Sequence, residues 1–134
     1  MQQGYVLVVD DNVGIRRLLY ELLTQEGYNV ETAENGMECL IKVQVNKLDL
    51  IILDAKMPGI SGIETVNMLK KSNPDLPIIM ISAYSEMPLI SEALENGSIK
   101  YYLTKPFDLD KVRNLVKVLV KKGTRLDYEN CSEQ

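Results

Sequence analysis

The chain has 134 residues, of which 46% are hydrophobic and 25% are charged, and its formal net charge is −4. This length and balance are typical of one soluble domain with one substantial core, so we expect no second folded unit. The acidic pI near 4.9 argues against direct nucleic-acid binding. No segment approaches the roughly 20 apolar residues that cross a bilayer, and the first residues lack the features of a signal peptide. We therefore expect a cytoplasmic protein without a membrane segment.

Strands and helices are predicted to alternate along the chain. Short apolar runs are typical of strands buried on both faces of a parallel sheet, whereas apolar residues spaced three or four apart indicate helices. In chain order the pattern predicts a strand at residues 6–9, a helix around 15–23, a weaker strand at 30–33, a helix at 37–45, a strand at 50–53, a helix at 63–71, a strand at 78–81, a helix at 87–95, a weaker strand at 100–104 and a helix at 109–121.

The first helix has the clearest pattern. Its apolar residues all have the spacing of one helix face: Ile15, Leu18, Leu19, Leu22 and Leu23. Asp11 or Asn12 is placed to cap its start, and Gly27 is placed to end it. These signals predict a helix that lies between the first two strands.

The fivefold alternation predicts an α/β protein with a flavodoxin-like (βα)5 fold. Right-handed crossovers produce a doubly wound parallel sheet with helices on both faces, and the strand order 2-1-3-4-5 suits five such repeats. The domain is expected to span residues 1–122. Because periodicity is lost from Thr124 onward, residues 123–134 are expected to form a disordered polar tail.

Histidine and cysteine usage excludes several kinds of site. The chain has no histidine, which excludes Ser-His triads, His-based metal sites and a phosphohistidine on this chain. Cys39 lies in a helical pattern and Cys131 in the tail, so neither belongs to a metal-ligand or disulfide spacing. We interpret Cys39 as part of the core.

Polar side chains follow four of the predicted strands where each strand ends. They are Asp10 and Asp11 after the first strand, Asp54 after the third, Ser82 after the fourth and Lys105 after the fifth. Open α/β sheets bind ligands at this carboxyl edge. If strands 1 and 3 are adjacent, roughly 4.8 Å apart, Asp54 lies close to the Asp10–Asp11 pair.

Three crowded carboxylates require a cation, protonation or both. Like charges about 4 Å apart repel by around 4 kcal/mol at an effective dielectric near 20. A hard divalent ion with oxygen ligands is the natural partner, and Mg²⁺ suits the site better than Ca²⁺ because no calcium-loop spacing is present. With Asp54 as nucleophile, Ser82 as hydroxyl donor and Lys105 as cation, the group favours phosphoryl transfer.

Four motifs in order resemble those of bacterial two-component response-regulator receivers. They are VVDDN at residues 8–12, LDAKMPGISG at 53–62, ISA at 81–83 and LTKPF at 103–107. The resemblance covers roughly residues 4–121 and is closest to single-domain receivers of a sporulation phosphorelay. It implies a two-component signal-transduction phosphoprotein that catalyses its own aspartyl phosphorylation and slow dephosphorylation.

The resemblance also implies a role for each site residue. Asp54 would be the phosphoacceptor and a metal ligand, Asp10 and Asp11 would hold Mg²⁺ directly or through water, and Lys56 would offer its backbone carbonyl to the metal. The phosphoryl group would then be contacted by two further side chains, Lys105 and Ser82. The peptide bond after Lys105 is expected to be cis.

An aromatic residue near Lys105 would complete a switch with Ser82. Tyr102 matches the aromatic switch position of the family. This chain has one residue more than usual between Gly97 and Lys105, so we expect the loop before the fifth strand to bulge and Tyr101 to compete for the same role.

The first helix has more apolar positions than one buried stripe needs, which raises the hypothesis of a docking surface for a partner helix. The proposed docking residues are Gly14, Ile15, Leu18, Tyr84, Pro106 and Phe107. The alternative is that Ile15 and Leu18 are simply part of the core.

The expected function is a phosphorelay step that accepts a phosphoryl group from phosphohistidine and passes it to a second histidine protein. The partners would be histidine kinases and histidine phosphotransferases, and the chain would be a monomer. One alternative is a switch that binds an output protein through the face of helix 4, strand 5 and helix 5. A flavin or nucleotide binder fits worst, because the chain has neither a glycine-rich phosphate loop nor tryptophan.

Overall fold

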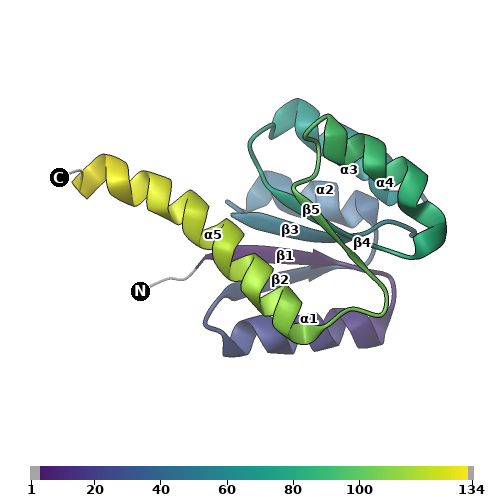
Figure 1. Ribbon diagram of the computed structural model, residues 1–134, viewed down its shortest axis with the longest axis horizontal. Coiled ribbons are helices and arrows are strands. Elements are labelled where there is room, and N and C mark those ends of the chain that lie inside the picture. Colours follow the sequence, from purple (N-terminus) through teal and green to yellow (C-terminus); the bar gives the residue numbers. More distant parts are fainter. Residues whose placement is uncertain (1–3, 133–134) are drawn as a thin grey trace.

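The computed structural model describes residues 4–132, except for the side chains of Tyr84 and of residues 121–132. Strands and helices alternate along the chain (Figure 1). Their bounds are β1 Tyr5–Val9, α1 Val13–Gln25, β2 Asn29–Ala33, α2 Gly36–Val45, β3 Leu50–Asp54, α3 Gly62–Ser72, β4 Ile78–Ser82, α4 Met87–Glu95, β5 Tyr101–Thr104 and α5 Leu109–Ser132, with a 3-10 turn η1 at Tyr84–Glu86 before α4.

The sheet is parallel throughout and has the order β2-β1-β3-β4-β5. This confirms the predicted flavodoxin-like fold and strand order. The inner strands β3 and β4 are buried along their whole length, whereas the edge strands β2 and β5 are mostly half-buried or exposed. That difference explains why the edge strands gave the weaker apolar signals. All five carboxyl ends meet at one edge of the sheet.

Two hydrophobic cores cover the two faces of the sheet. Figure 1 shows α1 and α5 on one face and α2, α3 and α4 on the other. The first core joins the strands to buried apolar side chains of α1 and α5, namely Leu19, Leu22, Leu23, Val112, Val116 and Val120. The second core includes Cys39 of α2, which is fully buried as predicted. Each fully buried aliphatic side chain contributes roughly 1.5–3 kcal/mol, so both layers stabilise the position of the sheet edge.

Helix α1 begins and ends where local signals placed it. The Asn12 side chain accepts a hydrogen bond from the Ile15 N–H at 3.0 Å, so Asn12 rather than Asp11 is the cap. At the other end Gly27 has φ 98°, a left-handed conformation that glycine adopts without strain. The next N–H, that of Tyr28, closes the turn on the Leu23 carbonyl at 3.1 Å. Because Asn12 caps it, the start of α1 is anchored directly beside Asp10 and Asp11.

The last helix is longer than its predicted range of residues 109–121. Helix α5 continues to Ser132, through most of the tail that was expected to be disordered. Its last turns extend past the sheet (Figure 1), so no apolar face is needed there and the periodicity that marks a buried helix disappears. The segment contains no proline, and its one glycine, Gly123, costs a helix only about 1 kcal/mol. Between residues 4 and 132, no helix is long and apolar enough to span a bilayer.

Candidate phosphoacceptor site

The strand order brings the predicted polar residues to one place. Asp54 is the last residue of β3, Asp10 follows β1 directly, Ser82 ends β4 and Lys105 follows β5 directly. These strands are consecutive neighbours in the sheet, so their ends line up along its carboxyl edge. The register pairs Asp54 with Ile81 and Ser82 with Thr104, so Ser82 lies one residue, and Lys105 two residues, beyond the level of Asp54.

Three carboxylates meet at the centre of this edge. One oxygen from each of Asp10, Asp11 and Asp54 lies within 4.8 Å of the others. Asp10 and Asp54 are only 1% and 3% exposed, whereas Asp11 is exposed. Burial of like charges at this spacing is unfavourable unless a cation or protons compensate them.

Lys105 supplies one compensating charge from the protein itself. Its Nζ lies 3.0 Å from Asp54 Oδ1. The Lys105 backbone N–H donates to the Ser82 carbonyl at 2.9 Å, which fixes the chain just where the lysine leaves β5. The Lys105–Pro106 peptide bond is cis, as predicted.

Burial and crowding shift the protonation of the cluster. Desolvation, and then the charge of Asp10, raise the pKa of Asp54 from 3.8 to about 6, although the hydrogen bond from Lys105 acts against them. Desolvation also raises the pKa of Asp10, against the hydrogen bond from the Asn12 backbone. Burial alone would lower the pKa of Lys105, but the hydrogen bond and charge of Asp54 raise it on balance. Lys105 is therefore a cation at neutral pH, whereas the raised pKa of Asp54, about 6, lies close to neutral pH.

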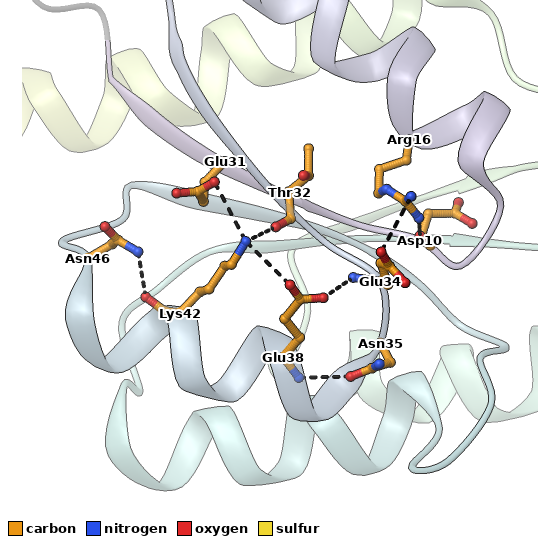
Figure 2. A network of polar contacts seen from close by, with 9 residues as sticks. All are labelled: Asp10, Arg16, Glu31, Thr32, Glu34, Asn35, Glu38, Lys42 and Asn46. Atoms are coloured by element: carbon orange, nitrogen blue, oxygen red, sulfur yellow. Dashed lines mark hydrogen bonds and ion pairs between the residues drawn. The ribbon is translucent and has the colours of Figure 1, made fainter.

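Hydrogen bonds from three directions hold Asp10. Its carboxylate accepts from the Asn12 N–H at 2.9 Å, and its backbone N–H donates to the Ala33 carbonyl at 3.1 Å. Arg16 Nη1 donates to the Asp10 carbonyl at 2.7 Å, and Arg16 Nη2 lies 3.9 Å from a carboxylate oxygen of Glu34 (Figure 2). Sequence reasoning did not assign this role to Arg16, because a single arginine on a helix gives no local signal of a contact with the turn before it.

The Arg16 contact continues into a wider polar network. The Glu34 N–H donates to Glu38 Oε1 at 2.7 Å, and Glu38 Oε2 pairs with Lys42 at 3.5 Å. Lys42 also lies 3.6 Å from Glu31 of the edge strand (Figure 2). The network thus links the turn after β1, the turn after β2 and the outer face of α2.

The loop after β4 is held through its backbone, since the Ser82 carbonyl accepts the Lys105 N–H at 2.9 Å and the Ala83 carbonyl accepts the Glu86 N–H at 3.1 Å. Ser82 is fully buried, yet its Oγ has no hydrogen-bond partner among the described residues. The next N–H, that of Ala83, donates to Glu86 Oε1 at 3.0 Å. Glu86 begins α4 without a side-chain cap bond. Sequence reasoning missed Glu86, although its place four residues after Ser82, in the same loop, is a signal that could have found it.

Helix α3 packs tightly against the Asp54 backbone. A Cβ on Gly62 would lie 2.6 Å from the Asp54 carbonyl oxygen and 2.7 Å from Ala55 Cα, so only glycine fits there. At the start of the same helix, Ser61 and Glu64 form a capping box on either side of Gly62 in the sequence. The end of β3 is therefore held in close contact with the start of α3.

The two tyrosines of β5 lie on different faces. Tyr102 is half-buried and packs on the core beneath α2, α3 and α4, whereas Tyr101 is 39% exposed. Their ring centroids are 6.3 Å apart. Strand β5 pairs with β4 residue by residue from Tyr101 to Thr104, so the strand itself contains no bulge.

The proposed docking residues lie in mixed surroundings. Leu18 is 45% exposed, whereas Ile15 is half-buried and packs partly against the core beneath α1. Phe107 is also half-buried against that core. The other two with described side chains, Gly14 and Pro106, are exposed. The side chain of Tyr84 lies outside the described residues.

A pocket of about 420 Å³ opens onto the carboxylates and is lined by Asp11, Asn12, Asp54, Lys56, Ala83, Glu86 and Lys105. The donor set fits a hard divalent cation such as Mg²⁺, because it consists of carboxylate oxygens. One of them, Asp10 Oδ2, is buried and has no hydrogen-bond partner among the described residues. Such an oxygen is costly to bury unless a cation or another donor reaches it.

A comparison with known families agrees with this site. The family described as the response regulator receiver domain matches residues 6–117, which include all the strand-end residues. The chain belongs to this family, which confirms the resemblance inferred from its motifs.

The chain is also similar to individual known proteins. The chain is 39% identical over 117 residues to the sporulation initiation phosphotransferase F of Bacillus subtilis, a match that covers 87% of this chain and 94% of that protein. It is 39% identical over 112 residues to the transcriptional regulatory protein ZraR of Klebsiella oxytoca, a match that covers 84% of this chain but only 25% of that longer protein. Among solved structures, the chain is similar to the response regulator TrrA of Thermotoga maritima, determined in complex with Mg²⁺ and BeF. The two sequences are 42% identical and the TM-score is 0.76; the match covers 89% of this chain and 99% of that one.

Proposed function

We propose that this chain is a phosphorelay receiver in which Asp54 accepts a phosphoryl group from a phosphohistidine and later passes it to a histidine on a second protein. One observation carries the proposal: Asp54 faces a pocket, pairs with Lys105 at 3.0 Å and shares the site with two more carboxylates within 4.8 Å. The similarity to sporulation initiation phosphotransferase F over 94% of its length supports the relay. Because the chain has no histidine, both donor and acceptor histidines belong to other proteins, a kinase and a phosphotransferase.

Asp54 would act as the nucleophile. An oxygen of its carboxylate bonds to phosphorus as the bond from phosphorus to the imidazole nitrogen breaks, and the imidazole keeps the electron pair and takes up a proton. A carboxylate attacks only when ionised, and a pKa of about 6 leaves Asp54 mostly ionised at pH 7 and above. Transfer onward is the same step in reverse toward another imidazole.

The other site residues would stabilise the charge on the transferred group. Asp10, Asp11, Asp54 and the Lys56 backbone carbonyl would hold Mg²⁺, which supplies positive charge next to the phosphoryl oxygens when bound. Lys105 would exchange its contact with Asp54 for one with the phosphoryl group. The second such contact would come from the hydroxyl of Ser82, which has no other described partner.

Partner docking would use the surface beside the pocket. Leu18, with Gly14 and Pro106 exposed nearby in the fold, would contact a helix of the partner, and the half-buried Ile15 would support that surface. Leu18→Ala should then slow transfer from phosphohistidine while leaving phosphorylation by a small phosphodonor unchanged. If Leu18→Ala changes the rates from both donors by the same factor, or changes neither, Leu18 acts in packing alone.

A second candidate function is a switch that binds an output protein. Exposed apolar side chains on α4 and α5 favour it, since Leu89 of α4 is 58% and Val118 of α5 56% exposed. A pocket of about 180 Å³ lies on this face beside Tyr101, Tyr102 and Lys111. In this reading Ser82 closes on the phosphoryl group and Tyr102 reports the change to the surface.

A single labelling experiment separates the candidates. Purified protein is incubated with Mg²⁺ and a radiolabelled phosphohistidine donor, and a second histidine phosphotransfer protein is then added. A relay transfers label to Asp54 and then to the added histidine, whereas a switch retains it until hydrolysis. Asp54→Asn should take up no label; normal labelling of this variant would exclude Asp54 as acceptor and overturn the proposal.

A further inference from the structure

Glu86 is an acidic residue in the pocket to which the phosphoacceptor mechanism assigns no role. Its Oε1 accepts the Ala83 N–H at 3.0 Å, and both residues line the pocket that contains Asp54 and Lys105. Glu86 stands at the N-cap position of α4, yet its side chain caps no N–H of that helix. Its carboxylate has instead turned back toward the end of β4.

The hydrogen-bond donors at the end of β4 suit an anion. Ser82 Oγ is buried and has no described partner, and the adjacent Ala83 N–H is bonded to a carboxylate. Two adjacent donors, of which Ala83 lines the same pocket as Lys105, form a place where anionic oxygens are stabilised. Glu86 therefore occupies a position that a phosphoryl oxygen on Asp54 could use.

Phosphorylation changes the charge balance beside Glu86. A carboxylate with one negative charge becomes an acyl phosphate with about two, and its oxygens require new donors. The pocket already contains the carboxylates of Asp11 and Asp54 beside Glu86, so the added charge repels Glu86 more than before. The Ala83 N–H cannot donate a full hydrogen bond to both the Glu86 carboxylate and a phosphoryl oxygen on Asp54.

We propose that Glu86 is an internal competitor for the phosphoryl site: its carboxylate holds the Ala83 N–H before phosphorylation and is displaced when Asp54 carries the phosphoryl group. The inference rests on the proposed function and adds a residue that regulates the same site. Displacement also frees the first turn of α4, because Glu86 is the residue where η1 meets that helix. Glu86 thus couples the state of Asp54 to the start of α4.

The test uses beryllium fluoride, a phosphoryl mimic, at saturating Mg²⁺. Glu86→Ala removes the competitor, and we expect the apparent affinity for beryllium fluoride to rise about 5- to 10-fold, the effect of one ordinary hydrogen bond. Glu86→Gln keeps an acceptor oxygen but loses the charge, so its affinity should rise about 2- to 3-fold. The matched control is Glu92→Gln, an exposed glutamate on the same helix, which should change nothing.

A second readout is the amide resonance of Ala83, recorded first without Mg²⁺ and mimic and then with both. The amide resonance of Ala83 in the unphosphorylated wild type should report a hydrogen-bonded N–H, and it should shift in Glu86→Ala but not in Glu92→Gln. On addition of Mg²⁺ and beryllium fluoride, wild type and Glu86→Ala should converge on the same Ala83 resonance. Unfolding curves of each variant identify any loss of fold, in which case Glu86→Gln carries the comparison.

The outcomes separate this inference from the proposed function. If the wild type binds the mimic and both Glu86 variants bind it no more tightly than Glu92→Gln does, the competitor is refuted while the phosphoacceptor stands. A failure of the wild type itself to bind the mimic or to become labelled on Asp54 overturns both. An unchanged Ala83 resonance in Glu86→Ala also refutes the competitor.

Discussion

On the β1 side of the pocket, Asp10 is held through its carboxylate, its backbone N–H and its carbonyl, by Asn12, Ala33 and Arg16. On the β4 side, the Ser82 and Ala83 carbonyls accept backbone N–H groups, but Ser82 Oγ has no described partner and the Ala83 N–H donates to the side chain of Glu86. Both sides end buried strands of the same sheet, so burial does not explain the difference. The β1 side is built as a fixed position and the β4 side as one that can change partners.

The two kinds of construction suit two different tasks. Carboxylates that repel one another must be positioned in advance if they are to bind a cation, because a loose cluster relaxes apart. A loop that responds to phosphorylation must exchange contacts at small cost, and segments with few internal bonds do so most easily. The comparison predicts that changes on the β1 side act mainly through metal affinity, and changes on the β4 side through the phosphoryl group.

The largest effect is expected at Lys105, which contacts Asp54 at the end of β3, the strand between β1 and β4. Lys105→Met removes the cation 3.0 Å from Asp54 and should slow phosphorylation about 100-fold, the effect of one charged hydrogen bond in a partly buried site. The measurement is the rate of labelling with a small phosphodonor at fixed Mg²⁺. Lys117→Met, an exposed lysine of α5, is the matched control. A rate within threefold of wild type would show that the carboxylates and the metal suffice without Lys105.

The next effect concerns pH and stability in the absence of divalent ions. The folded pKa of Asp54, about 6, lies above its ordinary value of 3.8, so folding favours the protonated form. Its contribution is therefore fully present below about pH 4 and is lost as pH rises through about 6. The free energy of unfolding of wild type should fall by about 2 kcal/mol relative to Asp54→Asn across that window.

Urea unfolding in EDTA at closely spaced pH values would measure that loss. Added Mg²⁺ should restore the stability of wild type at pH 7 and have a smaller effect on Asp54→Asn. A constant difference between the two proteins from pH 4 to pH 7 would mean that Asp54 titrates as an ordinary exposed carboxyl does.

A smaller effect tests the fixed side directly. Arg16→Gln removes the hydrogen bond to the Asp10 carbonyl and should weaken Mg²⁺ binding about 10-fold, within the range known for residues that orient metal ligands. Loss of a positive charge alone would strengthen binding of a cation, so the two explanations differ in sign. Arg17→Gln is the control, since Arg17 is exposed and pairs only with Glu21 among the described residues. Tighter binding in both variants would show that Arg16 acts through charge and not through position.

Much of the fold could be predicted because its signals are local. Buried strands read as short apolar runs, and the helices between them showed one apolar face each, so the alternation followed directly. The polar residues Asp10, Asp54 and Ser82 stood at strand ends, and in a parallel sheet such ends must meet. The helical pattern stops at residue 121 although α5 runs to Ser132, since loss of periodicity indicates the absence of a buried face and not the absence of a helix.

Contacts between side chains of different elements were not predictable in this way. Arg16 reaches the Asp10 carbonyl, and Glu86 reaches the Ala83 N–H, through side-chain conformations that neither sequence spacing nor propensity specifies. Ile15 and Leu18 satisfy the same helical pattern, yet one is half-buried and the other 45% exposed. Helix periodicity is too coarse to separate the centre of a buried stripe from its margin.

By itself, the sequence determined the alternation of strands and helices, the strand ends at which the chemistry lies and the residue types available there, since these depend on patterns within short segments. Only the tertiary structure decided that three carboxylates come within 4.8 Å, that Lys105 pairs with Asp54 and that the pKa of Asp54 rises to about 6. The physical reason is that Coulomb interactions and desolvation depend on distances across the sheet and on the depth of burial, and both arise only when the separate segments pack together.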